Sequence, residues 1–596
     1  MIEEALLRHW GYRSFKPLQR EAVEAALAAR DSLIVLPTGG GKSLCYQLPA
    51  ALKGGLVLVV SPLIALMDDQ VASAREAGIK ADALHSNLES DGRNDAYRRL
   101  ERGETELLYV SPERLLVGDL AEDIAPRLAL VAVDEAHCVS HWGHDFRPEY
   151  RRLKEVFDLW PKTARMALTA TATPAVQDDI CAQLGLRDPA RLIGHPDRPN
   201  LIYRAFPRRD QLAQIQEVID RHPREAGIVY VQTRKDVDRI AAGLAAGGLS
   251  CAPYHAGLNA DQRRRAHEGF VAEDLDVIVA TIAFGMGIDR TNVRFVVHAN
   301  TPKSMEHYQQ ESGRAGRDGL EAECVLLFAA SDLVLHRRLA KMDGALSPER
   351  ERALDKQLRE IGRFAVSPLC RHRLLVEHFG ASCPAASCAA CDVCLGETRG
   401  LAPEEALVTA KKVLSAAWRA EGRYGGGYVV GLLLGKADDR MSRNGHDKLA
   451  VFGLLREAGE ASVRSWVDQL IVQGFLETVD GEYPLLRITK AGKALCRDEG
   501  EVKLGAVIPQ SRDKKKAKGR AVVPAGGALF ERLRALRMAL AKKARIPPYV
   551  VFHDSSLAEM ATLKPRTLEE LRSIKGVGEV KLKRYGEEFL KIIAGS

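Results

Sequence analysis

The sequence lacks any uninterrupted apolar run close to the roughly 20 residues that a membrane-spanning helix needs. It also lacks the basic opening segment of a secretory signal peptide, because the chain starts with the acidic stretch Met1-Ile2-Glu3-Glu4. These absences exclude a membrane-embedded protein and predict a cytosolic one. A chain of 596 residues with ordinary globular composition is too long for one hydrophobic core, so we expect about three to five domains.

Most of the eleven cysteines show no regular spacing. They are scattered through apolar or mixed stretches and look like reduced core or surface thiols, which agrees with a cytosolic compartment. The cysteines of this kind are Cys45, Cys138, Cys181, Cys251, Cys324 and Cys496.

The chain also has no large excess of positive or negative charge, since the net charge is only +7. This small excess of basic residues is unevenly distributed along the chain. Residues 511–520 carry six basic and one acidic residue, and residues 526–596 carry fourteen basic and eight acidic residues. A basic tail on a nearly neutral body suggests a polyanionic partner, although a solvated linker followed by a helical surface explains the charge equally well.

The most informative stretch is Pro37-Thr38-Gly39-Gly40-Gly41-Lys42-Ser43, between the apolar run 32–36 and an apolar stretch that reads as a helix. A strand, a glycine loop and a helix N-terminus form a phosphate cradle, because glycine lets backbone N–H groups approach phosphates closely. Lys42 would reach the β- and γ-phosphates and the Ser43 hydroxyl would hold Mg²⁺. The usual first glycine is replaced by Leu36, so a chance glycine-rich loop stays open from this stretch alone.

The segment Asp134-Glu135-Ala136-His137 ends a second apolar run, residues 128–133. A carboxylate at the C-terminal end of a strand lies where ligands bind in open α/β sheets. Asp134 would hold Mg²⁺ and Glu135 would polarise the attacking water. Two half-sites that follow two buried strands therefore predict hydrolysis of a nucleoside triphosphate.

Apolar runs alternate with helical patterns in two successive series, about 1–205 and 206–340, which is typical of parallel sheets. The predicted strands include residues 57–60, 107–110, 166–168, 227–231, 277–280 and 295–297. The second series has no phosphate loop, but it holds Gln310-Glu311-Ser312-Gly313-Arg314-Ala315-Gly316-Arg317. Arg314 and Arg317 would reach ATP bound on the first series, and such arginine fingers contribute about 10³–10⁵ in rate.

In order along the chain, these segments resemble the motifs of superfamily 2 helicases and, more narrowly, of the RecQ family. The further matching stretches are residues 15–19 (FKPLQ), 61–66 (SPLIAL), 168–172 (LTATA), 254–258 (YHAGL) and 280–289 (ATIAFGMGID). The resemblance covers residues 5–592 and implies an α/β fold of two tandem RecA-like parallel-sheet lobes, a zinc-binding helical module, a winged helix and a small all-α HRDC domain. The expected boundaries are 1–205, 206–340, 341–402, 403–505 and 526–596, with a basic flexible linker at 506–525.

The resemblance also implies roles at the nucleotide. Tyr12, Lys16 and Gln19 would contact adenine, Asp289 would belong to the nucleotide site, and Gln310 would act with the arginine pair in catalysis. Lys16 stands where the family more often has arginine. We expect weaker stacking there, because an ammonium group has no flat face.

Residues 141–150 (HWGHDFRPEY) interleave aromatic side chains with histidines and an arginine. Such a loop suits contact with single-stranded nucleic acid, and it resembles the loop that couples DNA binding to hydrolysis in RecQ enzymes. Stacking of one base, about 1–3 kcal/mol, is comparable with the roughly 1.4 kcal/mol cost of separating one base-pair step. Core packing of the aromatic side chains is the alternative. The candidate DNA contacts are Trp142, His144, Phe146 and Arg147.

The other five cysteines are clustered. Consecutive C-x-x-C spacings in a reducing compartment favour a metal over a disulfide, and four thiolates describe a closed structural Zn²⁺ site. The RecQ zinc module has the same layout, with one cysteine on a helix followed by a compact trio. The predicted ligands are Cys370, Cys388, Cys391 and Cys394. Cys383 would be free, although it is able to replace one ligand, and His372 and His378 stay open as alternative ligands.

Helical patterns followed by candidate strands at 474–478 and 485–489 fit a winged helix, a common duplex-binding fold. Residues 444–449 (NGHDKL) resemble the segment that the family has here, which makes His446 and Lys448 candidate DNA contacts. Tyr483, in the turn, is a candidate for separating strands, with an exposed turn tyrosine as the alternative.

Residues 546–552 (IPPYVVF) and 574–578 (IKGVG) resemble the HRDC domain. The glycine turn before a basic helix would place N–H groups and three basic side chains against a phosphate, namely Lys581, Lys583 and Arg584. HRDC folds vary in whether they bind DNA, so a protein contact or a spacer role stays open.

The resemblance implies a bacterial-type DNA helicase that uses ATP, Mg²⁺ and a structural Zn²⁺, moves 3′→5′ on single-stranded DNA and serves recombination and repair in the bacterial cytosol or nucleoid. Its partners would be single-stranded and duplex or forked DNA, with a single-stranded DNA-binding protein as a further candidate and no membrane. A monomer is expected. Two rivals stay open: an RNA helicase of the same superfamily, and a zinc-containing winged-helix DNA-binding protein whose ATP site is a switch.

Overall fold

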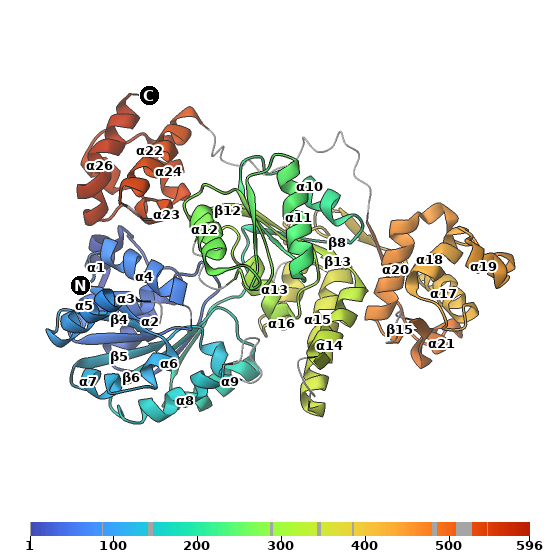
Figure 1. The fold of residues 1–596 in the computed structure, drawn as a ribbon, viewed down its shortest axis with the longest axis horizontal. Helices are drawn as coiled ribbons and strands as arrows, with labels where there is room; N and C mark the ends of the chain where they lie inside the picture. The colour runs from blue at the N-terminus through green and yellow to red at the C-terminus, as the bar shows by residue number, and fades with distance from the viewer. Residues whose placement is uncertain are drawn as a thin grey trace.

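The computed structural model describes residues 2–62, 64–85, 88–140, 147–285, 290–342, 347–383, 387–479, 485–507, 527–544 and 546–595. Two α/β lobes occupy the first half of the chain, and a helical region and a separate C-terminal helical domain follow them (Figure 1). In the part of the chain that the structure describes, no helix is both long and apolar enough to cross a bilayer.

The first lobe is built on a parallel sheet with the strand order β3-β4-β2-β5-β6-β1-β7. Both faces of this sheet are buried, because Leu33 and Val35 pack into one apolar cluster and Ile34 into another. The strands are β1 (Ser32–Val35), β2 (Leu56–Val60), β3 (Ala81–Leu84), β4 (Leu107–Val110), β5 (Leu128–Val133), β6 (Ala164–Thr169) and β7 (Ala190–Ile193). The helices are α1 (Ile2–Trp10), α2 (Gln19–Leu27), α3 (Leu44–Leu52), α4 (Ile64–Glu76), α5 (Ser90–Glu101), α6 (Pro112–Leu115), α7 (Leu120–Ile124), η1 (Ala125–Arg127), η2 (Ala136–Val139), α8 (Pro148–Phe157) and α9 (Pro174–Gln183).

The second lobe repeats this design, with the parallel order β10-β11-β9-β12-β13-β8. Ile228 and Val229 of its central strand belong to different apolar clusters, so this sheet is also covered on both faces. The strands are β8 (Leu201–Pro207), β9 (Ala226–Tyr230), β10 (Cys251–Tyr254), β11 (Val277–Ala280), β12 (Val293–His298) and β13 (Ala322–Phe328). The helices are α10 (Gln211–Ile219), α11 (Arg234–Ala246), α12 (Ala260–Val271), α13 (Met305–Ser312) and α14 (Ala330–Met342).

A cysteine-containing module and a mostly helical domain follow the second lobe. The module contains α15 (Pro348–Val366), α16 (Arg371–His378) and β14 (Thr398–Gly400), and β14 pairs with β17 (Gly505–Val507). The domain between those two strands has a short hairpin, β15 (Leu476–Val479) with β16 (Leu485–Ile488). Its helices are α17 (Pro403–Arg419), α18 (Gly426–Leu434), α19 (Asp439–Arg443), η3 (His446–Lys448), η4 (Arg456–Ala458), α20 (Glu460–Val472) and α21 (Lys490–Cys496).

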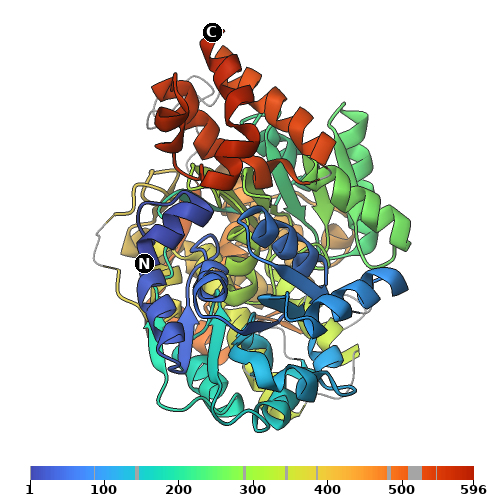
Figure 2. The ribbon, with the colours of Figure 1, turned by 90° about the vertical axis from the view of Figure 1, so that its left-hand side faces the viewer.

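The C-terminal helical domain, residues 527–595, packs against both lobes, as the two views show (Figures 1 and 2). On the second lobe, the Glu273 carboxylate accepts hydrogen bonds from Arg537 at 2.8 Å and Arg534 at 3.1 Å. On the first lobe, a Cβ added to Gly11 would lie 2.4 Å from the carbonyl carbon of Val577. The helices are α22 (Ala528–Ala544), α23 (Pro548–Val551), α24 (Asp554–Leu563), α25 (Leu568–Arg572) and α26 (Glu579–Ala594).

The predicted fold class is confirmed, since two parallel-sheet lobes precede the helical regions. The strand stretches named from the sequence correspond to β1, β2, β4, β5, β6, β9, β11, β12, β15 and β16. The outermost strands of both large sheets were not predicted, namely β3, β7, β8 and β10. β7 and β10 consist only of partly buried or exposed residues and have no apolar run. β10 also contains Pro253, which suits a strand at the edge of a sheet.

Candidate active site and zinc centre

The phosphate loop connects β1 to α3 in a backbone conformation that depends on glycine. Gly39 and Gly41 have φ angles of +80° and +78°, in the left-handed region. The N–H of Gly40 donates to the Pro37 carbonyl at 2.8 Å, which closes a tight turn. The loop leads directly into the N-terminus of α3, where backbone N–H groups are available to bind an anion.

Lys16 and Gln19 hold the carbonyl side of this loop. Lys16 Nζ donates to the Gly39 carbonyl at 2.6 Å, and Gln19 Nε2 donates to the carbonyls of Gly40 and Gly41 at 3.2 and 3.0 Å. Burial lowers the pKa of Lys16, and the nearby Lys575 and Arg198 lower it further. Tyr12, the third side chain expected at adenine, packs beside the apolar cluster of α1 and α3, and burial raises its pKa.

The acidic segment follows β5. Asp134 is 8 % exposed, and its pKa is raised to about 7, first by burial and then by the neighbouring Glu135. Glu135 has a left-handed backbone, φ +48°, and its buried Oε2 has no hydrogen-bond partner among the described residues, with His137 Nδ1 3.4 Å away. Two crowded carboxylates, one with an unsatisfied oxygen, fit a site that takes a divalent cation and a water.

His137 connects this acidic segment to the end of β6. Its Nδ1 lies 2.9 Å from Thr169 Oγ1, and burial lowers the pKa of His137 to about 3, so it is neutral. The N–H of Leu36 donates to the Thr169 carbonyl at 3.1 Å. One threonine thus contacts both the acidic segment and the start of the phosphate loop.

The arginine segment follows α13 and faces the phosphate loop. A Cβ added to Gly313 would lie 3.0 Å from Thr38 Oγ1, and one added to Gly39 would lie 3.5 Å from the Cα of Arg317. Arg314 is 5 % exposed, and its Nε has no hydrogen-bond partner in the described part of the chain. The phosphate loop of the first lobe and the arginine segment of the second lobe therefore lie side by side.

Other predicted residues are placed as follows. Lys42 Nζ is 3.4 Å from the Leu36 carbonyl, next to the loop. Gln310 lies on α13, and Arg147 donates to the Pro62 carbonyl at 3.1 Å. Four predicted residues lie outside the described residues: Trp142, His144, Phe146 and Asp289.

Sequence reasoning missed Arg198, in the segment that joins the lobes. Its guanidinium donates to the carbonyl of Thr38 in the phosphate loop and to three carbonyls of the arginine segment, those of Gly313, Ala315 and Gly316. No motif signals this role, because the partners are backbone atoms distant in the chain.

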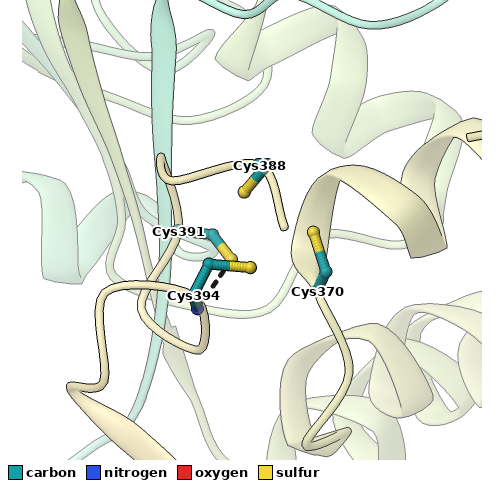
Figure 3. A group of neighbouring side chains, drawn as sticks. All are labelled: Cys370, Cys388, Cys391 and Cys394. Atoms are coloured by element: carbon teal, nitrogen blue, oxygen red, sulfur yellow. Dashed lines mark hydrogen bonds between the residues drawn. The ribbon is translucent and has the colours of Figure 1, made fainter. Parts of the chain in front are cut away.

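The four predicted zinc ligands come together (Figure 3). Their sulfur atoms all lie within 4.8 Å of one another, with Cys370 at the start of α16 and Cys388, Cys391 and Cys394 on the following loop. The N–H groups of Ala390 and Cys394 point to the sulfurs of Cys388 and Cys391 at 3.3 and 3.4 Å. Four thiolates with N–H donors to two of them fit a closed tetrahedral Zn²⁺ site.

The alternative ligands lie elsewhere. Cys383 is not part of the four-sulfur group. His372 pairs with Asp197 at 2.5 Å, and His378 Nε2 lies 2.8 Å from a Glu306 oxygen. The module is held by a buried pair in which Arg371 contacts both oxygens of Asp392 at 2.9 Å.

In the mostly helical domain between β14 and β17, His446 Nδ1 lies 2.7 Å from the hydroxyl of Tyr428. Tyr428 stacks on Tyr424 with centroids 4.0 Å apart, and the Arg440 guanidinium lies 4.9 Å from the Tyr424 ring centroid. Sequence reasoning missed this tyrosine pair, although Tyr424 and Tyr428 have helical i, i+4 spacing. Lys448 is exposed on η3, and Tyr483 lies outside the described residues.

Of the three basic residues predicted as phosphate contacts in α26, two lie close to the first lobe. Arg584 forms an ion pair with Glu76 of α4. Burial lowers the pKa of Lys581 to about 8. Lys583 is part of the same helix, and the preceding turn lies against Gly11. In this arrangement the glycine turn contacts protein.

Two stacked α/β lobes with one composite phosphate site define a nucleotide-dependent enzyme of the helicase type. The family descriptions that match are DEAD/DEAH box helicase (16–180), helicase conserved C-terminal domain (210–319), RecQ zinc-binding (330–395), RQC domain (404–513) and HRDC domain (527–593). The match to the zinc-binding family agrees with the four-cysteine cluster, which confirms the expected structural zinc; ATP and Mg²⁺ are expected for such a helicase domain.

Three bacterial relatives are similar to this chain over nearly its full length. The protein named ATP-dependent DNA helicase RecQ in Haemophilus influenzae is 39 % identical over 98 % of this chain and 94 % of its own length. The proteins of the same name in Pasteurella multocida and Bacillus subtilis are 40 % and 39 % identical, over 98 % and 99 % of this chain and 92 % and 98 % of their lengths. The chain belongs to the RecQ family.

Proposed function

We propose that this protein is an ATP- and Mg²⁺-dependent DNA helicase, which couples ATP hydrolysis to movement along single-stranded DNA and to unwinding in recombination and repair. The observation that carries the proposal is the composite site, in which Thr38 and Gly39 of the phosphate loop lie against Gly313 and Arg317 of the other lobe. A site completed by two lobes makes hydrolysis sensitive to how the lobes are positioned, which is what a motor requires.

Each side chain has a distinct role in this proposal. Lys42 binds the β- and γ-phosphates, while Ser43 and Asp134 hold Mg²⁺, which neutralises phosphate charge when bound. Glu135 accepts a proton from the attacking water, a role supported by its buried, unsatisfied Oε2. Arg314 and Arg317 stabilise charge on the transferred phosphoryl group, with Gln310 beside them on α13.

The adenine contacts are proposed for Tyr12, Lys16 and Gln19, and Asp289 is assigned to the same nucleotide site. Lys16 and Gln19 already bind carbonyls of the phosphate loop, so a base bound next to them would be linked directly to that loop. These contacts support a second role for Lys16 and Gln19 besides recognition of the base, which is to signal to the phosphate loop that a nucleotide is bound.

The DNA contacts are proposed in two regions. The loop with Trp142, His144, Phe146 and Arg147 would stack on and hold the single strand. His446, Lys448 and the tyrosine pair would contact the duplex, which is supported by the stacking of Tyr424 on Tyr428, the Arg440 guanidinium over Tyr424 and the contact of His446 with Tyr428. The proposed polarity is 3′→5′, and the proposed working unit is a monomer, with a single-stranded DNA-binding protein as a candidate partner.

For the C-terminal helical domain we favour the contact role over direct DNA binding in this arrangement. Lys581 and Arg584 face α4 or pair with it, which supports a role as an interdomain contact. DNA binding by these residues and Lys583 would require that the face be released from the first lobe.

The direct test is ATPase activity measured together with unwinding of tailed duplexes of both polarities, in DNA and in RNA. We expect DNA-stimulated hydrolysis and unwinding only of DNA with a 3′ tail. Lys42→Ala should retain DNA affinity and lose both activities. Unwinding of RNA but not DNA would support an RNA helicase, and unwinding by Lys42→Ala would refute the motor.

A further inference from the structure

Arg198 is partly buried between the phosphate loop of the first lobe and the arginine segment, residues 313–317, of the second lobe. Nη1 donates to the carbonyls of Thr38 at 2.8 Å and Gly313 at 3.2 Å. Nη2 donates to the carbonyls of Ala315 at 3.0 Å and Gly316 at 2.6 Å. One planar side chain thus connects the phosphate loop of the first lobe to the arginine segment of the second.

All the nitrogens of this guanidinium are engaged. Nε lies 3.3 Å from Asn200 Oδ1, so the five N–H donors of the group correspond to five acceptors. None of these hydrogen bonds is to a carboxylate, and burial lowers the pKa of Arg198. With its donors occupied, Arg198 is built to hold backbone and not to bind a phosphate.

The neighbours of Arg198 stabilise the same loop. Asn200 Nδ2 donates to the carbonyls of Gly316 at 3.0 Å and Leu320 at 2.8 Å, and Gly316 has φ +56°. The segment is anchored on its other side too, since the Asp197 carboxylate accepts the Arg198 N–H at 2.9 Å and pairs with His372 of α16. The interlobe segment therefore contacts the phosphate loop, the arginine segment and the zinc-module helix.

We propose that Arg198 is a positioning residue for hydrolysis, which fixes the arginine segment 313–317 against the Thr38 carbonyl so that Arg314 and Arg317 are set relative to the phosphate loop. This inference rests on the proposed function. The position of Arg314 and Arg317 matters for the transition state, whereas ground-state binding relies on the loop N–H groups and Lys42. Loss of Arg198 should therefore act on kcat more than on nucleotide affinity.

The test compares Arg198→Lys with Arg191→Lys, a matched control in the same part of the chain, since Arg191 is half-exposed and pairs only with Asp178 among the contacts described. Lysine keeps the charge but lacks the planar fork, so it cannot reach carbonyls of both loops. Misplacement of a catalytic group by about 1 Å can cost roughly 10²-fold. We expect kcat for DNA-stimulated ATP hydrolysis to fall about 10²-fold in Arg198→Lys, with the Kd of a fluorescent nonhydrolysable ATP analogue changed by less than about threefold.

Two further readouts separate positioning from simple destabilisation. The affinity for ADP with aluminium fluoride, a mimic of the transition state, should fall much more than the affinity for ADP alone. Asn200→Ala removes the bonds of Asn200 to Gly316 and Leu320 and one of the five Arg198 acceptors, but it leaves the four carbonyl acceptors of Arg198, so it should show a smaller fall in kcat with the same pattern. This variant also covers the case in which Arg198→Lys does not fold.

The outcomes are distinct. Inactive wild-type protein would refute the proposed function. Active wild-type protein together with Arg198→Lys and Asn200→Ala at control kcat would refute only the inference. Equal losses of ADP, analogue and aluminium fluoride affinity would also overturn it, because they would assign Arg198 to general folding of the site.

Discussion

The buried ion pairs between the second lobe and the C-terminal helical domain allow a quantitative prediction for Glu273→Ala. The Glu273 side chain is 3 % exposed, Arg537 is 1 % exposed, and their Oε1–Nη2 distance is 2.8 Å. Removal of one partner of a buried pair costs about 3–5 kcal/mol, because the other charge is left unpaired. Arg537 keeps Asp554 at 2.6 Å and the Phe552 carbonyl at 3.0 Å, so we take the lower end.

A loss of about 3 kcal/mol corresponds to a change of about two orders of magnitude in the equilibrium between the docked and released domain. Other contacts also hold the domain on the lobes, including Thr291 with His553 at 3.1 Å and the Gly11 contact with Val577. We therefore expect Glu273→Ala to release the domain more often while the docked form stays predominant.

Amide hydrogen exchange measures this opening. Peptides across the docking surface, residues 8–12 and 546–553, should exchange faster in Glu273→Ala, and the core of the first lobe should not change. The matched control is Asp261→Ala on α12, because Asp261 is 68 % exposed and pairs only with the exposed Arg264 among the ion pairs described. Exchange at the docking surface equal to that of the control would refute the reasoning.

Two further predictions concern the zinc centre and one histidine. Purified protein should contain one zinc per chain, and chelation or Cys391→Ser should unfold the module, whereas Cys383→Ser should leave zinc content unchanged; metal loss from Cys383→Ser would contradict the ligand set. Burial lowers the pKa of His222, but the carboxylates of Glu225 and Glu323 outweigh burial and leave this pKa raised. The charged imidazole therefore stabilises fully below its ordinary pKa of about 6.5, and the effect is lost as the pH rises through the raised value. His222→Gln should lower the free energy of unfolding by about 1–3 kcal/mol at pH 6 and less at pH 9 in urea titrations, and an equal loss at both would refute the assignment.

Much of the fold and of the nucleotide site could be predicted, because the functional residues directly follow apolar runs that are recognisable as buried strands. The glycine loop after β1 and the carboxylates after β5 each have a local sequence signature, because the residues of each motif lie within a single short segment. Three of the four clustered cysteines, Cys388, Cys391 and Cys394, were also predictable because consecutive C-x-x-C spacing brings their sulfurs together, whereas Cys370 was assigned from the resemblance to the RecQ zinc module. In each case the residues that act together are close in the chain or follow a recognisable strand.

The missed features depend on contacts that no local pattern encodes. Four of the five bonds of the Arg198 guanidinium go to backbone carbonyls more than 110 residues away, and any residue type offers a carbonyl. Glu273 has φ +64° in a turn after α12, and its partners Arg534 and Arg537 lie more than 260 residues further on. The sequence of the glycine turn at 576–578 leaves a phosphate contact and a protein contact open, and the contact of this turn with Gly11 appears only in the folded structure.

The central claim is that the second lobe completes the chemistry of a nucleotide held by the first. Single-turnover hydrolysis by Arg314→Ala, with the Kd of an ATP analogue measured on the same protein, tests it most directly. We expect the hydrolysis rate to fall by about 10³-fold or more while analogue binding stays close to that of the wild type. A hydrolysis rate that is unchanged in Arg314→Ala would contradict it.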